Sequence, residues 1–203
     1  MGGAHLAEGR KKGTERGAWI VFCDESGSLL TGHITHTWAP VGQTPVLTVV
    51  RGRQTRLSMA ALLCYRPAGN GVAGPARLIW RTRPGWYHDR QLIDLLDTAH
   101  QRLSAPMILI WDNLAGHHSG RMHQAIKERD WLQVENLPSY APDLNPAEGL
   151  WSLLDATVLA NLAALTLGEL RQAARAGLRT IQHRPALLNG FLTHTGLQPQ
   201  PGT

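Results

Sequence analysis

Residues Pro106 to Asn113 read PMILIWDN, an unbroken apolar run that stops at an aspartate. A continuous run, in contrast to an alternating one, is typical of a strand that is buried on both faces at the centre of a sheet. Leucines at three- and four-residue steps precede it, from Asp89 to Leu103, and predict a helix with Asp89 as its cap. The stretch therefore predicts an α/β domain.

Other segments extend this pattern in both directions along the chain. Apolar runs with glycine- and proline-rich punctuation predict sequential strands at 18–26, 45–50, 56–66 and 76–83. After PMILIWDN the pattern predicts a helix at 119–130, a strand at 131–137, a helix at 146–160 and a last helix that starts at Thr166. Strands followed by alternating strands and helices favour a mixed sheet covered by helices.

Size and composition favour one globular domain. The chain has 203 residues, 22.3 kDa and 43% apolar residues. Residues 1–17 are glycine-rich and charged, which predicts a flexible leader in front of a domain at 18–203. No apolar run is long enough for a membrane span, and no secretory signal is present, so we expect a cytoplasmic protein. Cys23 and Cys64 lie in apolar runs and are expected to be buried thiols.

The net charge of +5 favours an anionic partner such as a nucleic acid. Many of the arginines lie in the first half of the chain, but three recur at four-residue steps on the last predicted helix: Arg171, Arg175 and Arg179. A basic helix face is often only solvated. Contact with phosphates is the alternative, and both remain open at this point.

Two aspartates end predicted strands. Asp24 closes the first apolar run and Asp112 closes PMILIWDN. Ligands collect at strand ends in open α/β sheets, and neighbouring strands lie only about 5 Å apart, so two such carboxylates could share a cation. Each aspartate could instead only begin a turn. Glu25 should point to the opposite face of the strand from Asp24.

A third carboxylate follows a proline-rich loop, in LPSYAPDLNPAEGLW at residues 137–151. Asn145 can cap a helix, Pro146 suits its first turn, and Glu148 then falls at the third helical position. In a capping box this glutamate would only reach back to the amide of the cap. Whether Glu148 does more depends on the carboxylates that the fold brings near it.

Three segments together resemble the signature blocks of the DDE transposase family, in particular its mariner-type branch of bacterial insertion-sequence transposases. They are CDES at 23–26, WDNLAGHHS at 111–119, and LPSYAPDLNPAEGLW, and thirty-five residues separate Asp112 from Glu148. The resemblance implies a ribonuclease-H-like α/β fold, with a mixed five-stranded sheet flanked by helices. It also implies that residues 18–203 form the DDE catalytic domain.

By the same resemblance, Asp24, Asp112 and Glu148 are the catalytic residues and bind two Mg²⁺ ions, with Mn²⁺ as a substitute. Carboxylate oxygens suit these hard cations, and a pair of ions can assist both attacking and leaving oxygens. The implied activity is that of a DNA endonuclease and strand transferase in cut-and-paste transposition. The implied partners are double-stranded DNA, at the transposon ends and the target, and a second copy of the chain in a dimer. A bacterial, nucleoid-associated location follows.

Three further residues have two interpretations each. Asn113 could orient Asp112 or make a turn, His117 could touch DNA or be a helix-start residue without a role, and Trp38 could stack on a base or pack in the core.

Similar transposases carry an N-terminal helix-turn-helix region, which we expect to be absent here. The chain is then the second product of a split gene, with the helix-turn-helix on a separate polypeptide, or a catalytic fragment, or a decayed copy. The main rival hypothesis is an inactive remnant that binds DNA or an intact transposase without cutting. A ribonuclease-H-like hydrolase of RNA–DNA hybrids is a third.

Overall fold

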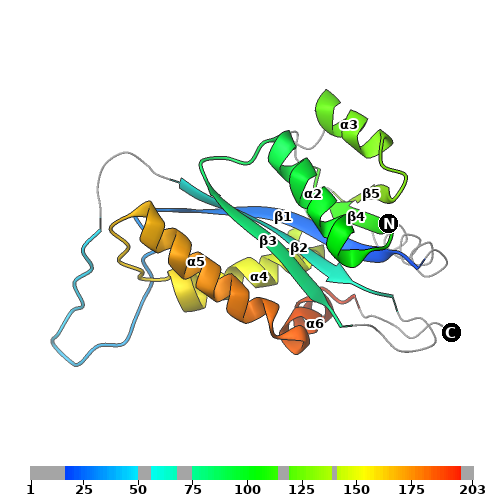
Figure 1. Ribbon diagram of the computed structural model, residues 1–203. Coiled ribbons are helices and arrows are strands. Elements are labelled where there is room, and N and C mark those ends of the chain that lie inside the picture. The colour runs from blue at the N-terminus through cyan, green and yellow to red at the C-terminus, as the bar shows by residue number, and fades with distance from the viewer. Residues whose placement is uncertain (1–16, 50–55, 68–74, 114–118, 139–140, 198–203) are drawn as a thin grey trace.

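The computed structural model describes residues 17–49, 56–67, 75–113, 119–138 and 141–197. In these ranges a five-stranded sheet has the order β3-β2-β1-β4-β5 (Figure 1). The strands are β1 (Trp19–Leu29), β2 (Arg56–Tyr65), β3 (Arg77–Pro84), β4 (Met107–Trp111) and β5 (Leu132–Asn136). β1 pairs antiparallel with β2 and parallel with β4, so the sheet is mixed. The predicted fold class is confirmed.

Helices cover both faces of this sheet (Figure 1). One face carries α2 (Asp89–Leu103) and α3 (Gly120–Lys127). The other carries α4 (Pro146–Leu154), the π-helical turn η3 (Asp155–Leu159), α5 (Leu167–Gln182) and α6 (Pro185–His194), and the short 3₁₀ turn η2 (Pro142–Leu144) leads into α4. None of the helices in the described ranges is long and apolar enough to cross a membrane.

The central strands separate two apolar cores. All five residues of β4 are buried, as its continuous apolar run predicts. Along β1, Val21 and Cys23 pack toward α2, whereas Ile20 and Phe22 pack toward α4. This alternation fixes which side chains of β1 reach each face.

The strand predicted at 45–50 is wrong over its described residues, 45–49, which have no strand structure. They belong to a long excursion on which Val46 is 92% exposed. In the sheet, β2 follows β1 directly as its antiparallel neighbour and pairs with β3 on its other edge, so this apolar run does not lie between them. Residue 50 and residues 1–16 of the leader predicted at 1–17 lie outside the described residues.

Two helix boundaries also differ from prediction. The cap of α2 is His88, whose backbone amide donates to Gln91 Oε1 at 3.0 Å, and Asp89 instead accepts a hydrogen bond from Ser119 Oγ at 2.6 Å. The helix predicted at 146–160 ends as an α-helix at Leu154 and continues as the π-helical turn η3. Thr166 caps α5 as predicted, since its hydroxyl accepts from the Glu169 amide at 3.2 Å.

Close packing of α5 against α4 and η3 requires a glycine at position 177. A Cβ there would lie 2.7 Å from methyl carbons of Leu154 and Val158. We expect Gly177→Ala to lower the free energy of unfolding by about 1–2 kcal/mol through overpacking, despite the better helix propensity of alanine. Urea unfolding measures this change.

Gly190, on α6, is the matched control because a Cβ there would meet nothing within 4 Å. Gly190→Ala should leave stability unchanged or raise it by about 0.5–1 kcal/mol. Equal effects at the two positions would contradict the packing described.

Candidate active site

Asp24 lies inside β1 and not at its end, so the sequence-based placement is wrong in this respect. The strand continues to Leu29 because β2 pairs with it throughout, with Asp24 opposite Ala61. On its other edge, however, the pairing of β1 with β4 stops at Phe22 and Ile110. Asp24 therefore lies two residues beyond Phe22, the last residue of β1 that pairs with β4.

Asp112 follows β4 directly, as predicted. Phe22 pairs with Ile110, so two residues further along these parallel strands come Asp24 and Asp112. Neighbouring strands are about 4.8 Å apart. The register thus brings the two aspartates to the same level of the sheet on adjacent strands.

Glu148 lies in the first turn of α4, and its carboxylate is exposed. Asn145 caps this helix, since its Oδ1 accepts from the Ala147 amide at 3.1 Å. The Asn145 amide itself donates to the Pro142 carbonyl at 2.8 Å, which replaces the return bond of a capping box. The interpretation of Glu148 as only a capping residue therefore loses its basis.

Trp151 links the helix of Glu148 to the strand of Asp24. Its Nε1 donates to Asp24 Oδ2 at 3.0 Å, and the tryptophan is buried. Residues three apart lie on nearly the same helix face, so Glu148 is one turn from this contact. The sequence analysis missed this bond. The need of a buried indole N–H for an acceptor is the signal that could have indicated it.

The electrostatics of Asp24 reflect this crowded setting. Burial raises the pKa of Asp24 from 3.8 to about 7, the Trp151 hydrogen bond opposes the rise, and the charges of Glu148, Glu25 and Asp112 add to it. Carboxylates that repel one another in a partly desolvated place favour a cation or a proton.

The donor chemistry fits a divalent metal ion, because all three predicted ligands supply carboxylate oxygens. Among the residues that the structure describes, however, no three acidic, histidine or cysteine side chains are close enough together to hold a metal ion. The backbone thus places Asp24 and Asp112 on adjacent strands, with Glu148 one helical turn from the Asp24 contact. Simultaneous ligation by all three requires their side chains to move closer.

Glu25 belongs to the other face of β1, as predicted. It accepts a long contact of 3.9 Å from the Cys23 thiol, and Cys23 packs with α2. Burial, followed by the nearby carboxylates, raises the pKa of the Cys23 thiol well above its ordinary value. Cys23 and Cys64 are both buried and free, as expected.

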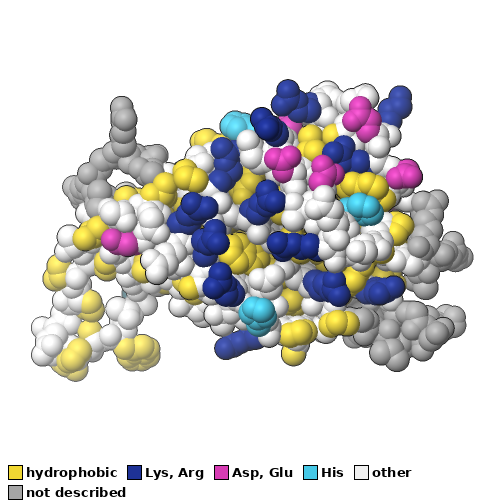
Figure 2. Space-filling view, viewed as in Figure 1, with side chains coloured by type: hydrophobic (Ala, Val, Ile, Leu, Met, Phe, Trp, Pro, Cys, Tyr) yellow, Lys and Arg dark blue, Asp and Glu magenta, His cyan; other side chains and the backbone are white. Residues whose placement is uncertain are grey.

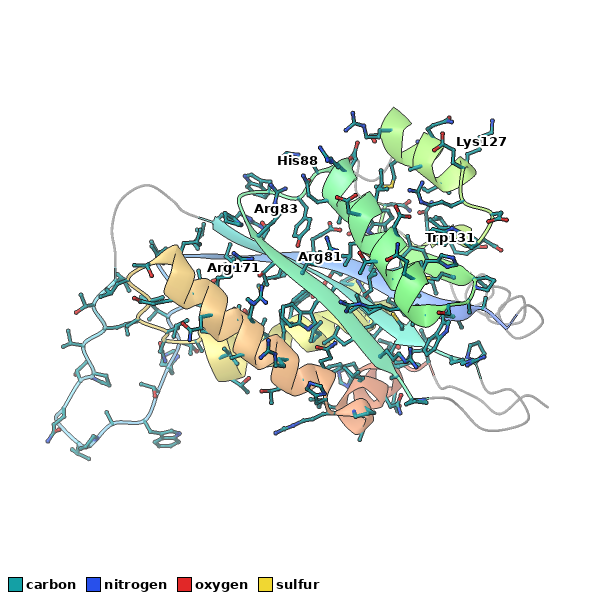
Figure 3. All side chains as sticks on the ribbon, in the orientation of Figure 1. Arg81, Arg83, His88, Lys127, Trp131 and Arg171 are labelled. Carbon is teal, nitrogen blue, oxygen red and sulfur yellow. The ribbon has the colours of Figure 1, made fainter. Side chains whose placement is uncertain are left out.

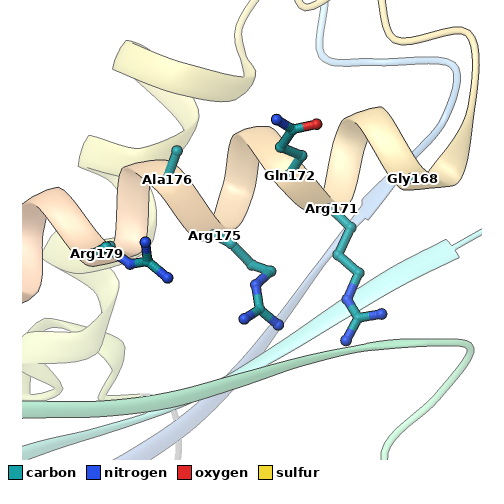
Figure 4. Close-up of a pocket in the computed structure, with 6 residues that line it drawn as sticks. All are labelled: Gly168, Arg171, Gln172, Arg175, Ala176 and Arg179. Atoms are coloured by element: carbon teal, nitrogen blue, oxygen red, sulfur yellow. The ribbon is translucent and has the colours of Figure 1, made fainter.

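The positions of the other predicted site residues differ from one to the next. Asn113 Nδ2 donates to the Leu137 carbonyl at 3.1 Å, so it fixes the segment that leads toward Glu148. Trp38 is fully exposed on the excursion at 33–49, which excludes core packing. His117 lies outside the described residues. Arg171, Arg175 and Arg179 line a separate groove beside β3. They also line a neighbouring pocket along α5, which Figure 4 shows.

A mixed sheet in the order β3-β2-β1-β4-β5, helices on both faces, and carboxylates on β1 and directly after β4 together define a ribonuclease-H-like domain. The sequence profile of the DDE superfamily endonuclease family matches residues 19–171. The chain therefore belongs to this family. The membership in the DDE family that the three sequence blocks indicate is confirmed.

Solved structures agree with this fold. The Mos1 transposase paired-end complex with left transposon end has a TM-score of 0.54 and 16% identity, over 97% of this chain and 60% of that one. The Mos1 mariner paired end complex with Mn gives 0.52 and 16%, over 95% and 61%. The corresponding complex with Mg gives 0.54 and 15%, over 97% and 61%. Comparison with curated proteins found no match.

The chain therefore spans about 60% of the length of these transposases.

The raised pKa of Asp24 predicts a pH-dependent stability difference between the wild type and Asp24→Asn. Between the ordinary pKa of 3.8 and the folded value of about 7, the folded chain retains a proton that the unfolded chain releases. The wild type should therefore lose stability relative to the variant as pH rises through this window, and the loss levels off above it.

We expect Asp24→Asn to be more stable above pH 7 by about 1–3 kcal/mol, measured by urea unfolding with a chelator present. Asp130→Asn, which neutralises an exposed aspartate away from the site, is the control over the same pH range. A difference between Asp24→Asn and wild type that is independent of pH would refute the assignment.

Proposed function

We propose that this chain is the catalytic domain of a cut-and-paste transposase that cuts DNA at insertion-sequence ends and joins them to target DNA. The observation that carries the proposal is the register of β1 and β4, which aligns Asp24 with Asp112, together with the Trp151 bond that ties the helix of Glu148 to Asp24. Similarity to Mos1 complexes supports it, because one of those contains a transposon end.

We propose that Asp24, Asp112 and Glu148 hold divalent metal, two Mg²⁺ ions with Mn²⁺ as substitute. Such ions, when bound, would activate the attacking oxygen and stabilise the leaving oxygen of an in-line displacement. The Mos1 structures with Mg and with Mn support the choice of metals. The bond from Trp151 Nε1 to Oδ2 would fix the orientation of the Asp24 carboxylate. Both of its oxygens keep a lone pair that could bind a metal ion.

The reaction has two balanced steps. Water adds to the scissile phosphorus, the bond from phosphorus to the 3′ oxygen breaks, and a 3′-hydroxyl and a 5′-phosphate result. The 3′-hydroxyl then attacks a phosphorus of target DNA, loses its proton, and displaces the 3′ oxygen of the target, which gains one. This chain would contribute three carboxylates, those of Asp24, Asp112 and Glu148, at the place where the divalent cations would bind.

The partners under this proposal are duplex DNA and a second copy of the chain, at the nucleoid of a bacterial cell. The paired-end form of the similar Mos1 complexes supports the pairing of two DNA ends, and the dimer is our proposal for what holds them. An inactive remnant is not favoured, because the chain retains all three carboxylates in one region of the fold.

Nicking of supercoiled plasmid in Mg²⁺ or Mn²⁺ tests the proposal. We expect Asp24→Asn, Asp112→Asn and Glu148→Gln each to reduce the rate by at least about 100-fold, since each removes a charged ligand. Glu25→Gln is the matched control: it neutralises the carboxylate next to Asp24, on the opposite face of β1, and should retain most of the activity.

Two outcomes would overturn the assignment. Equal nicking by wild type and all variants would indicate a contaminating nuclease, and absence of nicking by the wild type would favour the remnant. Cleavage of an RNA–DNA hybrid in preference to plasmid would instead identify a hybrid-specific hydrolase.

A further inference from the structure

A groove at the edge of the sheet gathers arginines from three elements. It lies between α5, the edge strand β3 and the end of α2, and has a volume of about 420 Å³. Its charged residues are Arg81, Arg102, Arg171, Arg175 and Arg179. Figure 2 shows Lys and Arg side chains across the centre of this face, with Asp and Glu side chains outside that area. We call this site the arginine groove.

The arginines of α5 are directed into the groove by the amphipathic pattern of the helix. Leu170, Ala174 and Leu178 are buried against the core. In Figure 4, which shows a neighbouring pocket along α5, the Arg171 and Arg175 side chains extend toward β3, whereas Gln172 extends to the other side of the helix. Arg179 lines the arginine groove together with them. Arg81 lies on the other side of β3, next to α2 (Figure 3).

None of the described contacts of these arginines is with a negatively charged group. Arg171 Nε donates to Thr82 Oγ1 at 3.3 Å, and an Arg81 guanidinium nitrogen donates to Thr98 Oγ1 at 2.7 Å. The Arg175 guanidinium lies 5.7 Å from the ring centre of Trp80. These partners are neutral, and no carboxylate is among the described residues that line the groove. Five like charges held in this way favour a polyanion.

The chemistry of the groove suits a phosphate backbone better than a peptide. Its lining is polar except for Trp80, so it lacks the apolar pockets in which protein partners anchor their side chains. The guanidinium group of arginine presents N–H donors in a planar arrangement that can bond two oxygens of one phosphate. Residues four apart on a helix rise about 6 Å per step, so the arginines of α5 span about 12 Å. That length corresponds to roughly three to four base pairs of duplex at about 3.4 Å each.

The arginine groove is separate from the carboxylates. Asp24 pairs with Ala61 on β2, and Ala61 pairs with Trp80 on β3, so two strand spacings separate Asp24 from the groove floor. This is about 10 Å within the sheet, and β2 intervenes. A backbone segment in the groove would therefore be a different part of the DNA from the scissile phosphate.

We propose that the arginine groove binds the backbone of duplex DNA, without regard to sequence, at a second contact away from the reacting carboxylates. The DNA partner rests on the proposed function, whereas the groove itself rests on the arrangement of its arginines. Removal of one arginine–phosphate interaction should lower the salt dependence of binding by about 0.9 in the slope of log K against log salt.

The test measures fluorescence anisotropy of a labelled duplex of arbitrary sequence, over a series of KCl concentrations with chelator present. Arg175→Gln combined with Arg179→Gln should reduce the magnitude of the slope by about 1–2. The matched control is Arg121→Gln combined with Lys127→Gln, which removes the same charge from exposed residues of α3 and should leave the slope unchanged. Thermal unfolding verifies that all variants fold.

An equal change in both double variants, no change in the groove variant, or no duplex binding by the wild type would each overturn the proposal. Displacement of duplex by polyglutamate at lower charge concentration than by unlabelled duplex would assign the groove to an acidic protein. Because the binding assay is free of metal, groove-dependent binding without metal-dependent nicking would count against the proposed function alone. Nicking with groove-independent binding would count against the groove alone.

Discussion

The register between β1 and β4 is the constraint on which the rest of the site depends. It fixes Phe22 opposite Ile110 and thereby places Asp24 and Asp112 at one level on adjacent strands. Side chains alternate along a strand, so a slip of one residue would turn Asp24 toward α2 and bring Glu25 to the α4 face. The two apolar cores oppose such a slip, because each accepts a different set of β1 side chains.

The α4 helix completes this arrangement through local interactions. Asn145 starts the helix, the Asn113 amide anchors the preceding segment at Leu137, and Trp151 binds Asp24 directly. The consequence is a partly buried carboxylate whose pKa is raised to about 7, chiefly by burial. A charged carboxylate in a partly buried position lowers the free energy of unfolding. Such a loss of stability is typical of functional sites.

Much of the fold could be predicted from the sequence because its elements carry strong local patterns. The continuous run of β4 and the leucine spacing of α2 are examples. The strand predicted at 45–50 failed because a strand needs a neighbour, and apolar composition does not reveal whether an edge is free. The length of β1 beyond Asp24 depends in the same way on its pairing with β2.

In the candidate site, too, the sequence motifs could be predicted, whereas contacts between residues far apart in the chain could not. The blocks around Asp24, Asp112 and Glu148 were visible as motifs, and the register that aligns the aspartates confirms only their proximity along the sheet. The Trp151 bond joins residues 127 positions apart and needed the structure. The arginines of α5 formed a visible stripe, but their grouping with Arg81 and Arg102 depends on how α5 packs beside β3.

Metal-directed cleavage of the protein would test most directly whether the three carboxylates share one metal site. Fe²⁺ would replace Mg²⁺, ascorbate and peroxide would generate radicals at the bound ion, and mass spectrometry would map the broken peptide bonds. Cuts near Asp24, Asp112 and Glu148, all suppressed by excess Mg²⁺, are the predicted result. Cuts confined to one of these segments, or cuts that Mg²⁺ leaves unchanged, would contradict a shared site.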